Sequence, residues 1–335
     1  MKVLVTGAAG FVGSVLARRL ASDARALDKP VTELILVDAQ APAGTNGAGS
    51  HSPSVSWRLG DLADTHWIDS LVALAPDVVF HLASMPGGAA ERDPGMGLAV
   101  NLHGTTRLFE QLAQGPGLPV VVYTSTVAVY GGSLPAVVDD ATPLKPMTSY
   151  ATHKLMTEYL LADLSRRGRL DGRSLRLPGI VARPPQAGGS APQLAGQVSA
   201  FMSDIIYRLA AGEAYTCPVS AVATCWWMSV GRCVDNLLHA ACITPAQITA
   251  QAVDSPAAAR TWQLPVLRFS IGELVNTLAK LYGADRSLLV TYAPNEAVQA
   301  QFGSQPLLVT AAARALGLQD DGNIESLVRR ALQPQ

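Results

Sequence analysis

The sequence predicts an α/β fold in which a doubly wound parallel sheet is followed by a smaller, mostly helical C-terminal lobe. Short apolar runs alternate with helical stretches through the first half of the 335 residues. A glycine-rich turn joins the first run to the first helical stretch. Near Arg183 the alternation fades and a Pro/Gly-rich segment begins. These observations favour two domains, residues 1–183 and 184–335, with some later chain crossing back to the sheet.

The first domain alternates strands with helices. The expected strands cover residues 2–6, 33–37, 55–59, 78–82 and 120–124. The expected helices cover residues 11–20, 67–74 and 96–114. Uninterrupted Val, Ile and Leu runs between helices are typical of a parallel sheet that is buried on both faces. In the second domain we expect helices at 201–211, 230–241 and 271–281, and the substrate between the two domains.

Charge and hydropathy exclude several classes of partner. The formal net charge is -1, so the chain has no electrostatic attraction to nucleic acid or an anionic membrane. We find no uninterrupted apolar run of about eighteen residues, the length of a membrane span. The first strand is expected almost at Met1, which leaves no room for a secretory signal. The sequence therefore predicts a cytoplasmic protein that binds neither nucleic acid nor membrane.

No metal site is predicted. The four cysteines, Cys217, Cys225, Cys233 and Cys242, lack the paired Cys-x-x-Cys spacing of zinc sites. We expect them to be small buried apolar side chains. His81, at the end of an expected strand, has no neighbouring cluster of histidines or cysteines and is expected to be structural.

The glycine-rich turn has the pattern Gly7-x-x-Gly10-x-x-Gly13 between a strand and a helix. Gly7 permits a tight turn, Gly10 lets a pyrophosphate approach the backbone, and Gly13 lets the helix pack on the strand. The helix N-terminus then offers free N–H groups to the phosphates. The turn therefore predicts a dinucleotide-binding domain of the Rossmann type.

Asp38, at the end of the second strand, favours NAD over NADP. A carboxylate there can accept hydrogen bonds from both hydroxyls of the adenosine ribose and would repel a 2′-phosphate. No Arg or Lys follows in residues 39–42 to neutralise such a phosphate.

Tyr150 and Lys154 lie four residues apart, so on a helix starting near Ser149 they project on one face. A nearby ammonium favours the phenolate, which can take the proton of a substrate hydroxyl while hydride leaves the same carbon. Thr126 ends the fifth strand, where parallel sheets bind ligands, and its hydroxyl can orient the reacting group.

These residues resemble the extended short-chain dehydrogenase/reductase superfamily. The matching pieces are Gly7-x-x-Gly10-x-x-Gly13, Asp61-Leu62, His81-Leu82-Ala83, Asn101, Thr124-Ser125-Thr126 with Val129-Tyr130-Gly131, and Tyr150-x-x-x-Lys154. The resemblance implies Thr126, Tyr150 and Lys154 as the catalytic residues. At the cofactor it implies Gly7, Gly10, Phe11, Val12, Gly13, Asp38, Asp61, Leu62, Leu82, Ala83, Ser84, Asn101, Ser125, Tyr150, Lys154, Pro178 and Ile180. At the substrate the expected residues are Ser84, Thr126, Tyr150, Gly179 and Arg183. A homodimer packed through residues 96–114 and 149–167 is also implied.

A narrower resemblance covers nearly the whole chain and is to the D-erythronate dehydrogenases, which oxidise a four-carbon sugar acid at C2. Residues 77–83, 127–132, 171–178 and 217–220 carry it. It implies an NAD-dependent dehydrogenase acting on a small sugar acid. The substrate lobe departs from the pattern, because Thr224 stands where an Arg is common and Gln305 where an aromatic residue is expected.

Other functions and roles stay open at this point. A nucleotide-sugar 4-epimerase with bound NAD is the main alternative. A non-catalytic sensor conflicts with the presence of Thr126, Tyr150 and Lys154 together. A dehydratase would need an acidic pair beside Thr126, where Val127 and Ala128 stand. Four more residues each have two possible roles. Arg176 and Arg183 can pair with a substrate carboxylate or form structural salt bridges. Glu91 and Asp93 can contact substrate or lie in a solvated loop. Trp226 and Trp227 are expected to pack within the lobe.

Overall fold

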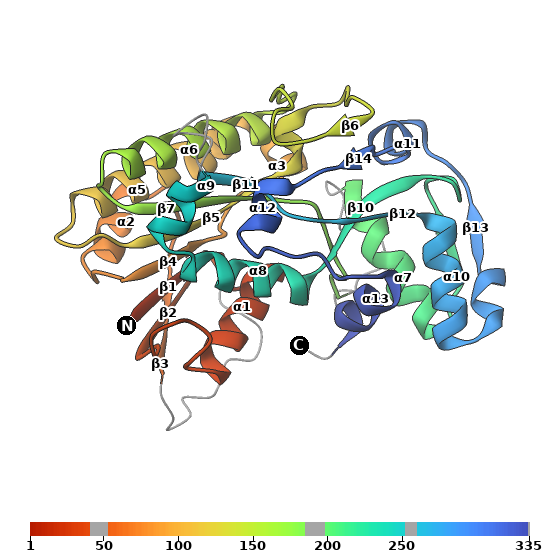
Figure 1. The fold of residues 1–335 in the computed structure, drawn as a ribbon, viewed down its shortest axis with the longest axis horizontal. Coiled ribbons are helices and arrows are strands. Elements are labelled where there is room, and N and C mark those ends of the chain that lie inside the picture. The colour runs from red at the N-terminus through yellow and green to blue at the C-terminus, as the bar shows by residue number, and fades with distance from the viewer. Residues whose placement is uncertain (41–52, 185–197, 252–259, 334–335) are drawn as a thin grey trace.

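A seven-stranded parallel sheet lies at the centre of the larger domain (Figure 1). The computed structural model describes residues 1–40, 53–184, 198–251 and 260–333. The strand order is β11-β7-β5-β4-β1-β2-β3, and every pairing is parallel. Five strands agree with the sequence prediction: β1 (Lys2–Thr6), β2 (Glu33–Asp38), β3 (Ser54–Leu59), β4 (Val78–His81) and β5 (Val120–Thr126). The predicted doubly wound parallel sheet is confirmed.

The sequence prediction missed two strands of this sheet, β7 (Asp171–Leu177) and β11 (Thr261–Gln263). β7 lacks an apolar run because Asp171, Arg173 and Ser174 are buried within it. Arg173 pairs with Asp171 at 2.9 Å, and this ion pair lets charged side chains occupy the sheet interior. β11 has three residues, too few for a periodic pattern.

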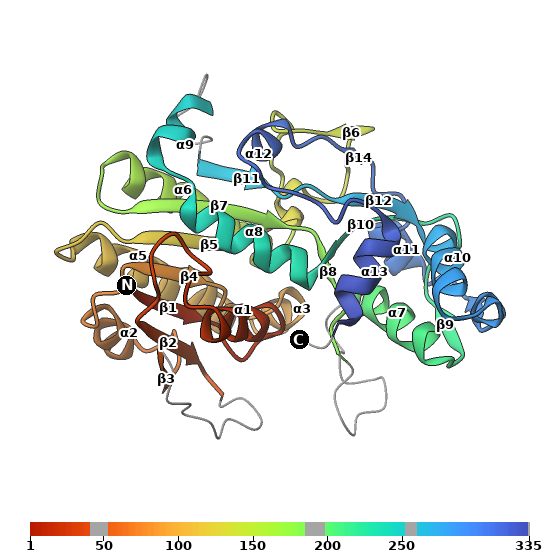
Figure 2. The ribbon, with the colours of Figure 1, turned by 60° about the horizontal axis from the view of Figure 1, so that its bottom comes forward.

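Helices cover both faces of the sheet (Figures 1 and 2). On one face α1 (Phe11–Ser22) and α8 (Val230–Cys242) pack with Val3 and Val5 of β1. On the other face α2 (Thr65–Val72), α5 (Thr105–Gln114) and α6 (Ser149–Arg166) pack with Leu4. Alternate residues of a strand therefore face the two layers, as the pleat requires. The helix predicted at 96–114 is divided into α4 (Pro94–Leu98), a π-helical turn (Ala99–Gly104) and α5.

The C-terminal lobe contains a second core built on a three-stranded sheet. In that sheet β10 (Thr224–Ser229) pairs with β8 (Gly179–Val181) and β12 (Leu267–Ser270). Helices α7 (Phe201–Ala211), α10 (Ile271–Tyr282) and α13 (Ile324–Leu332) pack against it. The prediction of a mostly helical lobe overlooked these strands, of which β8 and β12 have only three and four residues. The other elements are α3 (Gly87–Arg92), β6 (Val137–Val138), β9 (Tyr215–Cys217), α9 (Pro245–Gln251), β13 (Val290–Tyr292), α11 (Glu296–Phe302), β14 (Leu307–Leu308) and α12 (Ala311–Ala315).

Helix α8 lies between the two cores. The sequence prediction assigned residues 230–241 to the C-terminal lobe, and α8 packs against α13, β10 and β8 of that lobe as well as against α1, β5 and β7. Its Cys233, Val234 and Leu237 join the core of the large sheet. Together with β11 it is the chain that crosses back to the sheet. The proposed boundary at 183/184 adjoins residues 185–197, which lie outside the described residues. Among the described helices, none has the length and apolar content to cross a membrane.

Replacing Leu237 by alanine should therefore destabilise the large domain. Leu237 is fully buried, so Leu237→Ala should lower the free energy of unfolding by about 2–5 kcal/mol through lost burial and a cavity. Leu288, which is 85% exposed, provides the matched control, and Leu288→Ala should change stability by less than about 0.5 kcal/mol. Urea unfolding followed by circular dichroism measures both. Equal effects would contradict the packing described for α8.

Candidate active site

The predicted site residues gather at one edge of the large sheet. Gly7 follows β1, Asp38 ends β2, Leu82 follows β4 and Thr126 ends β5. These strands are consecutive neighbours in the order β5-β4-β1-β2, and all run in parallel. Their carboxyl ends therefore form one continuous ledge, the usual ligand-binding edge of such sheets.

The glycine-rich turn is tightly packed against the loop after β4. Gly7 has φ of 71°, a left-handed conformation that favours glycine. A Cβ on Gly7 would lie 2.7 Å from the Ala83 amide nitrogen, and one on Gly13 would lie 1.9 Å from the Gly7 carbonyl oxygen. Gly10 is exposed, and its nearest neighbour is within the turn itself. The turn therefore presents bare backbone at Gly10.

Helix α1 begins without a capping side chain. Gly10 is its N-cap and supplies no side-chain hydrogen bond, and the first turn contains no acidic residue. Phe11 and Val12, the first two helical residues, are half-buried. Free N–H groups and the helix dipole suit this end to a phosphate group.

The Asp38 carboxylate is held against the same turn. Its Oδ2 accepts a hydrogen bond from the Ala9 N–H at 2.9 Å, and its Oδ1 accepts one from the Gln40 N–H at 3.3 Å. A carboxylate fixed there has the geometry needed to bind ribose hydroxyls.

Asp61 and Leu62 have different surroundings. Asp61 is exposed, and its Oδ1 accepts a hydrogen bond from the Ala63 N–H at 2.9 Å. Leu62 is buried in the core, and a Cβ on Gly104 would lie 2.2 Å from its carbonyl oxygen. The Leu62 side chain is therefore not exposed to a ligand, and a contact with a cofactor stays a prediction.

His81 stabilises the loop after β4. It is fully buried, and its Nδ1 and Nε2 lie 2.7 Å and 3.0 Å from the hydroxyls of Thr6 and Thr105. Burial, assisted by the Lys154 charge, lowers the pKa of His81 to about 3 and keeps the ring neutral. The Ala83 N–H donates to the Thr6 hydroxyl at 3.3 Å. The expected structural role of His81 is thus confirmed.

Asn101 holds the segment that contains Ser84. It lies buried in the π-helical turn. Its Oδ1 accepts a hydrogen bond from the Met85 N–H at 2.7 Å, and its Nδ2 donates to the Met85 carbonyl at 3.0 Å. Both ends of the amide are therefore used to position this loop, and a direct contact of Asn101 with a cofactor stays a prediction.

At the end of β5, the Thr126 hydroxyl can still donate a hydrogen bond. Thr126 Oγ1 accepts a hydrogen bond from the Ala128 N–H at 3.1 Å, which leaves its own proton for another acceptor. Ser125 is buried and donates its hydroxyl to Glu158. Of the two, only Thr126 is left with a proton to donate.

Helix α6 begins at Ser149, as predicted, and its N-cap is Thr148. The Thr148 Oγ1 accepts a hydrogen bond from the Ala151 N–H at 3.2 Å. Glu91 accepts one from the Ser149 N–H at 2.6 Å, so this carboxylate helps define the start of the helix. Asp93 has a similar structural role as the N-cap of α4.

Lys154 lies beneath Tyr150 on the buried face of α6. The Lys154 side chain is 2% exposed, and its Nζ donates to the Thr124 carbonyl at 2.8 Å. The same Nζ is 5.7 Å from the Tyr150 ring centroid. The Tyr150 ring lies beside Gly87, whose Cβ would be 3.6 Å away, and the Ser84 side chain acts on the pKa of its hydroxyl.

Burial dominates the ionisation of this pair. It lowers the pKa of Lys154 to about 7, although the Glu158 carboxylate opposes the shift. It also raises the pKa of Tyr150 to about 12, against the effect of the Ser84 hydrogen bond. Burial therefore outweighs other effects on Tyr150 in the chain by itself, and the expected action of Lys154 on the phenolate stays a prediction. Further positive charge near Tyr150 is needed to make it a base at neutral pH.

A buried network that the sequence interpretation missed extends from this site. The Glu158 carboxylate accepts hydrogen bonds from Arg176 Nε at 3.0 Å and Nη2 at 2.7 Å. Arg176 Nη1 also donates to the Tyr130 hydroxyl at 3.3 Å. Of its two possible roles, Arg176 therefore has the structural one, an ion pair with Glu158. Glu158 follows Lys154 by four residues, a spacing that could have revealed it.

The segment after β7 joins the two cores. Pro178 connects β7 to β8, in which Ile180 is half-buried. A Cβ on Gly179 would lie 2.6 Å from the Met202 side chain, so close packing explains this glycine. The Arg183 guanidinium carbon lies 5.3 Å from the centroid of the Phe11 ring.

Thr224 and Gln305, the two residues that depart from the family pattern, contact each other. Thr224 donates its hydroxyl to the Gln305 carbonyl at 3.2 Å, and the Gln305 side chain accepts a hydrogen bond from the Trp226 N–H. Arg268 of β12 donates to Thr224 Oγ1 at 3.3 Å, so a cation from the neighbouring strand lies beside this threonine. Trp226 and Trp227 are buried, as expected for lobe packing.

Comparison with known proteins identifies the family. A model of the NAD dependent epimerase/dehydratase family matches residues 3–240. The chain belongs to this family. It is therefore an enzyme of the extended short-chain dehydrogenase/reductase type that works with a nicotinamide dinucleotide.

Relatives and solved structures agree with the family assignment. D-erythronate dehydrogenase from Cupriavidus necator is 35% identical over 99% of this chain and 98% of its own length. D-erythronate dehydrogenase from Haemophilus influenzae is 28% identical over 99% of each chain. The crystal structure of a nucleoside-diphosphate-sugar epimerase from Agrobacterium tumefaciens is 33% identical, with a TM-score of 0.85 over 98% of this chain and 92% of that one.

The residues at the ledge fit the cofactor of the family. The glycine-rich turn leaves bare backbone beside the uncapped end of α1, which suits a pyrophosphate. The Asp38 carboxylate lies within hydrogen-bonding distance of the same turn, and a carboxylate there suits a ribose. Within the described residues, no group of three or more His, Cys, Asp and Glu side chains could hold a metal ion. Cys217, Cys225 and Cys233 are buried and Cys242 is half-buried, all as free thiols.

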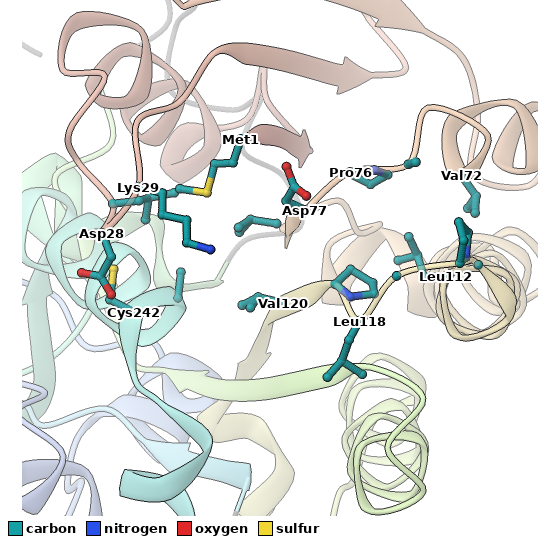
Figure 3. A pocket seen from close by; sticks show the side chains of 18 residues that line it. Met1, Asp28, Lys29, Val72, Pro76, Asp77, Leu112, Leu118, Val120 and Cys242 are labelled. Carbon is teal, nitrogen blue, oxygen red and sulfur yellow. The ribbon is translucent and has the colours of Figure 1, made fainter.

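A cavity of about 740 Å³ lies at the opposite edge of the sheet (Figure 3). Met1, Asp77 and Val120 line it where β1, β4 and β5 begin. Because the catalytic candidates follow the carboxyl ends of these strands, this cavity is not part of their site.

Replacing Lys154 by methionine should change stability in a pH-dependent way. The lysine pKa is about 10.4 in an unfolded chain and about 7 in the folded one. The unfolded state therefore binds more protons between these values, and wild-type stability rises with pH across that window. Lys154→Met, which buries no charge, should gain most relative to wild type at about pH 6 and least at about pH 10.

Calorimetric Tm values across this range measure the effect. Lys280, whose side chain is 76% exposed, supplies the control Lys280→Met, for which the Tm difference should not depend on pH. A constant difference for Lys154→Met would contradict the depressed pKa.

Proposed function

We propose that this enzyme oxidises a secondary hydroxyl of a small sugar acid, similar to D-erythronate, to the 2-oxo acid with NAD. The extent of the matches supports this proposal. The two D-erythronate dehydrogenases match 99% of this chain, including the C-terminal lobe. Relatives named dTDP-glucose 4,6-dehydratase and UDP-glucose 4-epimerase match only 52% and 48% of it. The lobe that would select the substrate therefore favours the sugar acid.

In the proposed mechanism Tyr150 is the base. Its phenolate takes the proton of the substrate hydroxyl. Thr126 donates a hydrogen bond to the oxygen of that hydroxyl and so orients it. Bound NAD would accept the hydride from the carbon that carries this hydroxyl. Lys154 supplies charge beneath Tyr150 and, by its bond to Thr124, keeps α6 against β5. Ser84 and Gly179 complete the proposed substrate contacts.

The proposed cofactor contacts follow the ledge from adenosine to nicotinamide. We assign the pyrophosphate to Gly7, Gly10, Phe11, Val12 and Gly13. The adenosine is assigned to Asp38, Asp61 and Leu62. The remaining dinucleotide contacts are assigned to Leu82, Ala83, Ser84, Asn101, Ser125, Tyr150, Lys154, Pro178 and Ile180.

A second candidate function is nucleotide-sugar 4-epimerisation with bound NAD. The observation that favours it is the full-length likeness to the structure described as a nucleoside-diphosphate-sugar epimerase. The same Tyr150, Lys154 and Thr126 would serve that reaction, so the substrate alone separates the two.

We also propose a cytoplasmic homodimer packed through residues 96–114 and 149–167. Met96, Leu98, Met156 and Tyr159 support it, because these apolar side chains are 36–57% exposed on this face of the isolated chain.

Tyr150→Phe tests the function and the mechanism. With NAD and a panel of four- to six-carbon sugar acids, wild type should reduce the cofactor without any nucleotide sugar. Tyr150→Phe should lower kcat by about 100-fold or more, because the base is lost while the ring remains. Tyr282→Phe, at a 37% exposed tyrosine that ends α10, is the control and should leave kcat unchanged.

Two results would count against the proposal. If wild type reduces NAD with none of the acids but interconverts UDP-sugars, the epimerase is favoured. Full turnover by Tyr150→Phe would exclude Tyr150 as the base.

Asp38→Asn tests the preference for NAD. The amide can still accept the Ala9 hydrogen bond, but it no longer repels a 2′-phosphate. The ratio of kcat/KM for NAD to that for NADP should fall about tenfold or more. Asp23, an exposed carboxylate just beyond the other end of α1, supplies the control Asp23→Asn. An NADP preference in wild type would overturn the proposed role of Asp38.

A further inference from the structure

Arg183 extends from one core of the molecule to the other. Its backbone belongs to the C-terminal lobe, where the preceding Val181 and Ala182 are buried. The Arg183 N–H donates to the Ser203 hydroxyl of α7 at 3.0 Å, and Tyr207 donates to the Ala182 carbonyl at 3.3 Å. The main chain at this point is therefore anchored to the lobe.

The side chain of Arg183 lies against the first residue of α1 in the large domain. Its guanidinium carbon is 5.3 Å from the centroid of the Phe11 ring, a cation–π contact. Phe11 directly follows Gly10, the exposed N-cap of the helix. The guanidinium is thus near the end of α1 that carries the positive partial charge of the helix dipole.

A guanidinium partly withdrawn from water beside this helix end favours an anionic ligand, in addition to the Asp38 carboxylate that accepts a hydrogen bond from Ala9 of the same turn. Burial lowers the pKa of Arg183, which reflects the cost of holding the charge there. The first turn of α1 contains no acidic residue. In the described part of the chain Arg183 forms none of the ion pairs, in contrast to Arg176, which is bidentate with Glu158.

The position of Arg183 favours a phosphate group over a substrate carboxylate as that anion. Tyr150, the proposed base, lies beside Gly87 and Lys154. Arg183 instead contacts Phe11, at the turn that suits a pyrophosphate.

We propose that Arg183 binds the pyrophosphate of the dinucleotide, and not the substrate carboxylate predicted from the sequence. The guanidinium fork matches phosphate oxygens and complements the backbone N–H groups of α1. Because Arg183 is anchored in the C-terminal lobe, the bound dinucleotide then links this lobe to the large domain. This inference rests on the proposed function only in that a nicotinamide dinucleotide is the cofactor.

Direct binding of ADP-ribose to the full-length protein tests the proposal. ADP-ribose carries the pyrophosphate but no nicotinamide, and its titration by calorimetry needs neither turnover nor the acid substrate. Arg183→Gln should raise the Kd of ADP-ribose and of NAD about 10- to 100-fold, the effect of losing one charge-assisted pair. Arg183→Lys should recover part of the loss. Adenosine lacks the pyrophosphate. Its Kd should therefore be the same for wild type and for Arg183→Gln.

The control is Arg208→Gln, an exposed arginine of α7 that pairs with Glu213. It should leave the Kd of ADP-ribose unchanged, and equal Tm values of the free proteins exclude misfolding of Arg183→Gln. An unchanged Kd for ADP-ribose in Arg183→Gln would overturn the proposal. So would a tenfold rise in the KM of the acid at saturating NAD. If no sugar acid is a substrate, the ADP-ribose titration still decides the role of Arg183.

Discussion

The hydrogen bond from the buried Lys154 amine to the Thr124 carbonyl joins the helix that carries Tyr150 to the strand that carries Thr126. At 2.8 Å and almost without solvent exposure, it leaves α6 little freedom to slide along β5. Glu158, one turn further along α6, reinforces the junction through Ser125. The relative position of the proposed base and the proposed hydroxyl therefore depends on buried polar contacts, which cost more to break than surface ones.

The two cores are less separate than the division of the sequence suggests. Helix α8 and strand β11 return from the second half of the chain to the large sheet, while β8 leaves the end of β7 to enter the small one. Arg183 follows β8 and reaches back to Phe11. The cofactor ledge is thus bordered by chain from both cores, so a change in either can alter the site.

Most of the candidate site could be predicted because its residues follow strands with clear apolar patterns. The turn at Gly7, Asp38 after β2 and Thr126 after β5 all meet at one edge once the strands are placed in a parallel sheet. Partners that lie far apart in the sequence could not be predicted. Arg176 of β7 pairs with Glu158 of α6, and sequence patterns normally assign such charged residues to the surface, although Glu158 is buried and Arg176 half-buried.

The sequence by itself determined the parallel sheet, the glycine-rich turn and the residue types at its carboxyl edge, because these depend on local periodicity and on short-range backbone geometry. The tertiary structure decided how each of those residues is used. Asn101 holds the Met85 backbone, the pKa of Tyr150 rises, and Arg183 lies at Phe11. Burial and long-range contacts set these properties, and both come from chain brought together only in the folded state.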